Sequence, residues 1–127
     1  MSDKKSYRGK GRIAFQNVVP SGRTTNSGMY PVSEAILVFD AKDLLERASM
    51  DFHYSYANQD NHLLLQARGS SLQGTLTTPP PIPSHSIEGY SFRLPGERML
   101  FWGTWNEQGA HYVWWAELEI EASEKDA

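Results

Sequence analysis

The chain contains 127 residues, of which 39% are apolar and 21% are charged, and its formal net charge is −3. These values are typical of one soluble globular domain that can bury a core without metal or disulfide support. The absence of cysteine excludes thiol chemistry, thiolate metal sites and disulfide bonds, and the small negative charge gives no general attraction to nucleic acid or to an anionic membrane.

The start of the chain shows no secretory signal, because the polar residues 1–5 are not followed by an apolar segment. The longest apolar runs, 35–39 and 112–116, are far shorter than the roughly 20 residues of a transmembrane helix. We therefore expect a cytoplasmic protein with no membrane partner.

The two ends of the chain carry opposite charges. We expect residues 1–10 to form a flexible basic arm, 11–122 a single β domain and 123–127 an acidic tail. A basic arm suits nucleic-acid binding; the alternative, which we prefer, is that the terminal strands lie side by side and neutralise each other. The charged residues concerned are Lys4, Lys5, Arg8, Lys10 and Arg12 at the start, and Glu117, Glu119, Glu121, Glu124 and Asp126 at the end.

Alternating apolar and polar residues predict short β-strands along most of the chain. Turn-forming residues separate these segments at hairpin-length intervals, and the proline-rich stretch 79–86 cannot be a central strand because proline lacks the N–H donor. The predicted strands cover 12–18, 30–40, 50–56, 62–68, 72–78 and 87–94, and two more form a hairpin over 101–115.

One short helix is predicted after the second strand. Asp40 is a suitable N-cap, Asp43 follows three residues later as in a capping box, and Leu44 and Leu45 supply an apolar stripe. The helix would end near Ala48.

The pattern as a whole predicts an all-β fold: a single-domain antiparallel barrel or sandwich of about eight strands with one short helix. Alternation assigns side chains to faces, but it does not decide which strands pair. Barrel and sandwich therefore remain alternatives.

The closing hairpin contains all four tryptophans within fourteen residues and is apolar on both faces. If residues 106–109 form the loop, Trp105 lies opposite Ala110 and Trp102 lies opposite Val113. One face then belongs to the core. The other face carries Trp102 and Trp115, and we consider three explanations for it: the helix packs against it, it is a subunit interface, or it lines a ligand pocket.

Phe101, Trp102 and Gly103 stand early in this hairpin, and Trp114 and Leu118 stand late in it. In this arrangement the segment, about a seventh of the chain, is similar to the closing strands of calycin-like barrels such as avidins and lipocalins. The N-terminal Gly-x-Trp typical of lipocalins is missing, and no site residue is carried over.

A second group of aromatic residues lies earlier in the chain, where Tyr54 and Tyr56 share a strand face with Met50 and Phe52. In a barrel these rings point inward, where they either fill the interior or line a cavity for a small ligand. The candidate ligand-binding residues are Tyr54, Tyr56, Trp102, Trp115 and His111.

The histidines show none of the usual metal-binding spacings. Asp51 and His53 share a strand face, as a metal site or an acid–base pair would require, and Asp60 and His62 repeat the spacing across a predicted turn. A solvated strand face is the more common explanation for such a pattern. We therefore expect no metal and no cofactor, and no catalytic residue is assigned.

The hypothesis that these patterns favour is a non-catalytic protein that holds a small, partly apolar or aromatic ligand in a β-barrel pocket. The first alternative is a structural protein that self-associates through the Trp102 and Trp115 face. The second is single-stranded nucleic-acid binding on an open barrel, which the acidic total disfavours. An enzyme using Asp51, His53 or His111 is a further possibility, although no sequence motif selects a reaction.

Overall fold

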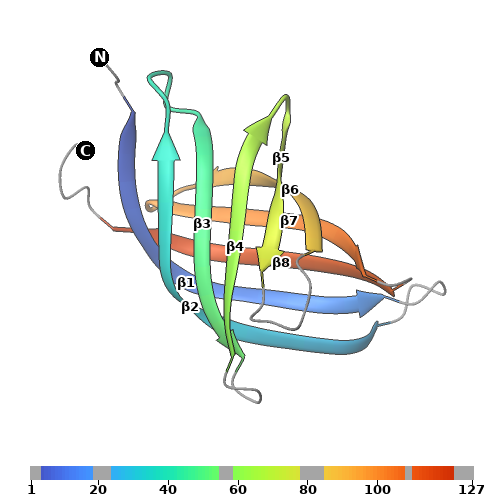
Figure 1. Cartoon of the computed structure of the whole chain (residues 1–127). Helices are drawn as coiled ribbons and strands as arrows, with labels where there is room; N and C mark the ends of the chain where they lie inside the picture. Colours follow the sequence, from blue (N-terminus) through green and yellow to red (C-terminus); the bar gives the residue numbers. More distant parts are fainter. Residues whose placement is uncertain (1–3, 19–23, 55–58, 78–84, 108–109, 122–127) are drawn as a thin grey trace.

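The computed structural model describes residues 4–18, 24–54, 59–77, 85–107 and 110–121, which form eight antiparallel β-strands (Figure 1). Each strand pairs with the next along the chain, and β8 pairs with β1, so the sheet is a closed barrel. The all-β prediction is confirmed, and the barrel is the correct one of its two alternatives. The strands are β1 (Lys5–Val18), β2 (Thr24–Phe39), β3 (Leu45–Tyr54), β4 (Gln59–Arg68), β5 (Ser71–Thr77), β6 (His85–Leu94), β7 (Arg98–Glu107) and β8 (Ala110–Ile120).

The barrel consists of two sheets that cross each other and share the long strands β1 and β2. Figure 1 shows β3, β4 and β5 upright beside the first part of β1 and the last part of β2, whereas β6, β7 and β8 run across behind them. The shared strands bend where the sheets meet. β2 has one extra residue between Val32 and Ala35 relative to β1, and Ser33 is the extra residue relative to β3, so a β-bulge marks its bend. On β1, a Cβ atom at Gly11 would overlap the carbonyl oxygen of Glu117, so only glycine allows β8 to approach so closely.

The predicted helix over 40–48 is wrong, and the described residues contain no helix. Asp40 does cap the backbone, since its Oδ1 accepts hydrogen bonds from the N–H groups of Lys42 (2.9 Å) and Leu44 (3.0 Å). Asp43 has a positive φ of 64°, which reverses the chain and starts β3 at Leu45. The same capping residues thus close a β-turn instead of opening a helix. It follows that no membrane-spanning helix is found among the residues described.

The first strand begins earlier than the sequence suggests. Residues 5–9, which belong to the expected basic arm, pair with β2 from Lys5 opposite Phe39 to Gly9 opposite Ala35. The basic start and the acidic end also meet, because Arg12 Nη2 lies 3.2 Å from Glu117 Oε1 on β8. The expected acidic tail, 123–127, lies outside the described residues.

The register of the closing hairpin differs from the prediction by two residues. Trp105 lies opposite Tyr112 and Trp102 opposite Trp115, since the strands extend to Glu107 and Ala110 and only two residues separate them. A shift of two keeps every side chain on its predicted face. The predicted faces are therefore correct although the predicted partners are not.

Large apolar side chains fill the middle of the barrel. They come from the inward-facing positions of the strands, and they pack closely against one another in one buried cluster. The largest fully buried apolar side chains are Phe39, Phe52, Phe101, Ile13, Leu37, Met50, Leu63, Leu65 and Leu118.

Candidate functional site

Aromatic side chains gather at one end of the barrel interior, and we call this group the aromatic end. Phe15 on β1 lies at its centre, with ring centroids 5.1 Å from Trp105, 5.3 Å from Phe52 and 6.2 Å from Tyr30. Trp105 stacks on Tyr112 at 4.7 Å with an interplanar angle of 6°. These distances are typical of favourable aromatic pairs.

The alternation of each strand explains why these rings meet. Phe15, Phe52 and Trp105 continue the inward-facing series of β1, β3 and β7 toward the same end of the barrel. Trp105 and Tyr112 are opposite each other in the β7–β8 ladder, which places their rings face to face. Asn61, a buried polar residue, lies opposite Phe52 on β4 and adds an amide to this end.

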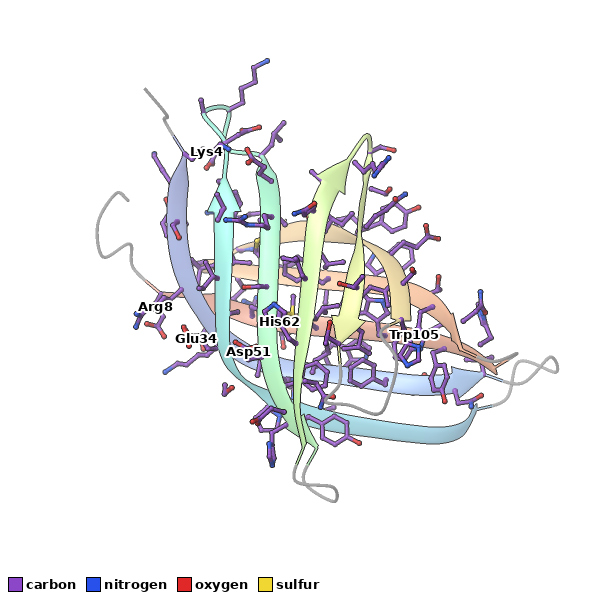
Figure 2. The ribbon with its side chains drawn as sticks, viewed as in Figure 1. Lys4, Arg8, Glu34, Asp51, His62 and Trp105 are labelled. Carbon is purple, nitrogen blue, oxygen red and sulfur yellow. The ribbon has the colours of Figure 1, made fainter. Side chains whose placement is uncertain are left out.

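An open hollow of about 460 Å³ lies beside Trp105, between β5, β6 and β7. Figure 2 labels Trp105 where ring-bearing side chains gather at this part of the barrel. The hollow therefore borders Trp105, which is 6% exposed, and combines amide, hydroxyl and carboxylate groups, with no lysine or arginine among the described residues that line it. Its polar lining side chains are Gln73, Ser86, Glu88, Thr104 and Asn106.

His111, a predicted ligand-binding residue, lies next to this hollow. It is opposite Asn106 in the β7–β8 ladder, and its Nδ1 donates a hydrogen bond of 2.8 Å to Asn106 Oδ1. This hydrogen bond orients the Asn106 amide at the rim of the hollow.

Trp102 and Trp115 lie opposite each other on the outer face of β7 and β8, not in the barrel interior. Trp102 contacts Tyr90, with ring centroids 4.9 Å apart, and the Arg12 guanidinium lies 5.6 Å from the Trp115 ring centroid. In the part of the chain that the structure describes, no helix covers this face. Of the three explanations for the face, an interface and a ligand site remain.

Of the two tyrosines that were expected to bind a ligand, the structure describes only the backbone of Tyr54. Met50 and Phe52 are buried inside the barrel as predicted. The backbone of Tyr54 ends β3, but its side chain and the whole of Tyr56 lie outside the described residues.

The two Asp-x-His segments come together on the outer face of β3 and β4. Asp60 and His62 lie on one strand, not across a turn, and the two segments pair reciprocally. His62 Nδ1 donates to Asp51 Oδ1 at 2.7 Å, and His53 Nδ1 donates to Asp60 Oδ1 at 2.9 Å. Figure 2 shows Asp51 and His62 side by side. No group of three or more potential metal ligands occurs among the residues that were described.

The basic residues beside the outer tryptophans are paired with an acid. Arg12 and Arg98 both contact Glu117, at 3.2 Å and 3.4 Å. The barrel is also closed, since β1 and β8 pair from Gly9 opposite Ile120 to Val18 opposite His111. The open barrel that the nucleic-acid hypothesis assumed is therefore not the observed arrangement.

Sequence reasoning missed Phe15, Tyr30, Trp105 and Tyr112 as members of one site. Trp105 and Tyr112 belong to the hairpin face that was assigned to the core, and a core assignment hides a site at the end of a barrel. Phe15 and Tyr30 were only assigned to predicted strands. The available signal was that several inward-facing aromatic residues stand close to predicted loops. No protein-family model and no curated protein matches this chain.

Proposed function

We propose that this protein is a non-catalytic binding protein for a small, partly aromatic ligand, and that the ligand lies in the hollow beside Trp105. The observation that carries the proposal is an open hollow with polar walls that borders Trp105, the residue whose ring stacks on Tyr112. An aromatic surface with a few polar groups around it is the usual composition of a small-molecule site.

The charge of the hollow indicates which ligands suit it. Among the described residues that line it, Glu88 has the only ionisable side chain. A neutral or positively charged ligand is therefore favoured over an anion, because a carboxylate repels an anion at short range. The amides of Gln73 and Asn106 supply both hydrogen-bond donors and acceptors.

The packing of the barrel explains why we place the ligand at the end and not in the middle. Phe101, Met50 and Leu65 are almost completely buried in the centre. A ligand there would have to displace well-packed side chains, whereas the hollow beside Trp105 is already open.

The test is native mass spectrometry on the full chain purified gently from its expression host, followed by a thermal-shift screen with neutral and cationic aromatic compounds. We expect a bound compound to raise the melting temperature of the wild type, since it binds only the folded state. Gln73→Ala and Asn106→Ala should weaken binding without unfolding the barrel, because both side chains are exposed.

Trp102→Ala is the matched control, since it removes a tryptophan from the outer face. Binding that survives in Gln73→Ala and Asn106→Ala but disappears in Trp102→Ala would move the ligand to the outer face. A screen in which no compound stabilises the wild type would overturn the proposal.

The outer face supports a second candidate function, self-association. Tyr90, Phe92 and Trp102 are large apolar residues that remain 41%, 49% and 43% exposed. The strand registers place Tyr90, Trp102, Trp115, Ala14 and Met29 in one row across five neighbouring strands. A contiguous apolar row of this kind is typical of protein interfaces.

Sedimentation equilibrium tests this candidate. If the outer face is an interface, the wild type forms a dimer or larger assembly, and Trp102→Ala combined with Trp115→Ala yields a folded monomer. An unchanged molecular mass in the double variant would exclude this face as the interface.

A further inference from the structure

Strand β6 is longer than its partner β5, and this difference leaves part of a sheet edge open. The β5–β6 ladder ends with Leu72 opposite Gly89, whereas β6 continues to Leu94 and pairs with β7 up to Leu94 opposite Arg98. Among the residues described, no strand pairs with the stretch from Tyr90 to Leu94 on its other side. Every second residue of that stretch directs its N–H and C=O toward the unpaired side.

A groove of about 530 Å³ lies along this open edge. One wall is β6 itself, at Tyr90, Ser91 and Phe92, and the opposite wall is made by the β2–β3 turn and the β4–β5 turn. Arg93 links the two walls nearby, since its guanidinium lies 5.0 Å from the Phe39 ring centroid and 3.9 Å from Asp43 Oδ2. The groove is thus a feature of the folded barrel and not of one loop.

We propose that the β6 edge binds an extended segment of another protein, which adds to the sheet as an extra strand. The stretch from Tyr90 to Leu94 spans about 13 Å at roughly 3.3 Å per residue, so about five residues of a partner would pair with it. Addition of a strand to an open edge is a common way to bind a peptide, with backbone hydrogen bonds for affinity and side-chain contacts for specificity.

The lining of the groove specifies the chemistry of that segment. Leu44, Tyr90 and Phe92 are exposed apolar residues on its walls, so the segment carries apolar side chains at alternate positions. Asp40 and Glu46 also line the groove, and Lys4 Nζ lies 2.6 Å from Glu46 Oε1. No lysine or arginine is among the described residues of its lining, so the carboxylate of Asp40 favours a segment that contains lysine or arginine.

The shape of the groove favours one strand over a second copy of the barrel. Residues of the β2–β3 and β4–β5 turns line the groove across from this edge. A strand that already has a neighbour on its far side would meet these turns, so a single extended segment is the occupant we propose. Natural sheets commonly block an open edge with proline or several charges. Here the only charged residue from Tyr90 to Leu94 is Arg93.

The test uses the full chain and a display library of random linear peptides of nine residues. We expect enrichment of peptides that alternate apolar residues and contain lysine or arginine. Hydrogen exchange of the complex, followed by NMR, should show that the unpaired amides between Tyr90 and Leu94 become at least tenfold more slowly exchanging. Side-chain docking without strand addition would leave these rates unchanged and would overturn the proposal.

A pair of matched variants locates the binding surface. Leu44→Asp should lower peptide affinity at least tenfold, because Leu44 lines the groove and is 62% exposed. The substitution should leave the turn intact, because Leu44 closes it through its backbone. The Leu44 N–H donates to Asp40 Oδ1, and the Leu44 C=O accepts from the Asp40 N–H. Ile36→Asp introduces the same charge at an apolar residue that is 39% exposed on β2, outside the lining of the groove, and should leave affinity unchanged.

Three results would overturn the proposal: no enriched peptide, equal affinity of the two aspartate variants, or a dimer of the wild type that Leu44→Asp dissociates. The last result would assign the edge to a second copy of this chain. None of these results depends on the hollow beside Trp105.

Discussion

The inner and outer faces of the β7–β8 hairpin carry the same residue type in opposite environments. Trp114 and Trp105 point into the barrel and are 2% and 6% exposed, whereas Trp102 points outward and is 43% exposed. Trp102 and Trp105 are only three residues apart on one strand. The comparison shows that tryptophan content alone says nothing about a site, because the pleat of the strand decides which indole stabilises the fold and which contacts solvent or a partner.

The two faces also differ in how tightly they hold their rings. Trp114 lies against Gly103 and Gly89, and its Nε1 donates a hydrogen bond of 3.3 Å to the carbonyl oxygen of Glu88. Trp102 contacts the ring of Tyr90 and is 43% exposed. The inner face therefore contributes more to the stability of the hairpin, and the outer face leaves an indole exposed to solvent.

The largest expected effect comes from Trp114→Ala. Truncation of a buried tryptophan removes its transfer free energy and leaves a cavity, which costs about 3–5 kcal/mol. We expect the free energy of unfolding, measured with urea, to fall by this amount, and to fall by only about 1 kcal/mol in Trp102→Ala. If Trp114→Ala does not fold, Trp114→Phe should show a smaller loss in the same direction. Equal losses in Trp114→Ala and Trp102→Ala would contradict the contrast between the faces.

The second prediction tests the packing beneath Trp114. A Cβ atom at Gly103 would overlap the carbonyl oxygen of Glu88 and lie 2.8 Å from Trp114 Nε1. We expect Gly103→Ala to destabilise the protein by about 1–3 kcal/mol through overpacking. Gly9→Ala is the control, because the nearest atom to its Cβ is 3.2 Å away. A smaller loss in Gly103→Ala than in Gly9→Ala, measured by thermal unfolding, would show that the indole does not need this space.

The sequence predicted faces well and partners poorly, and the hairpin explains why. Alternation is a property of one strand, so Trp102 and Trp105 could be assigned to opposite faces correctly. Register depends on where the connection begins. The predicted four-residue loop placed Trp105 opposite Ala110, whereas the observed two-residue connection places it opposite Tyr112. Closure of the barrel depends on pairing of β1 with β8, which are distant in the sequence.

The candidate site was harder to predict than the fold. The aromatic end joins residues of five strands that alternation can only label as inward-facing. These residues lie at the same end of the barrel because of the order and tilt of the strands, which alternation does not reveal. The helix error has a local cause, since Asp40 caps a turn with the same hydrogen bonds that would begin a helix.

A smaller effect is expected for the ring pair on the outer face. A double-mutant cycle of Tyr90→Ala and Trp102→Ala should give a coupling free energy of about 0.5–1 kcal/mol, as partly exposed aromatic pairs do. Urea unfolding of the four proteins measures this coupling. A value of several kcal/mol would mean that the outer rings stabilise the barrel as much as the inner ones do.

The smallest effect is expected for the paired Asp-x-His segments, which extend the comparison to the outer face of another hairpin. His62 and Asp51 are hydrogen-bonded at 2.7 Å, yet their side chains are 48% and 51% exposed. Water competes for both groups, so a double-mutant cycle of His62→Ala and Asp51→Ala should give a coupling of about 0.5 kcal/mol or less. The cycle of His53→Ala and Asp60→Ala should give no more than this, because that pair is 2.9 Å apart on the same strands and its aspartate side chain is 94% exposed. Couplings well above 1 kcal/mol in both cycles would show that polar pairs, and not only inward-facing rings, hold this barrel together.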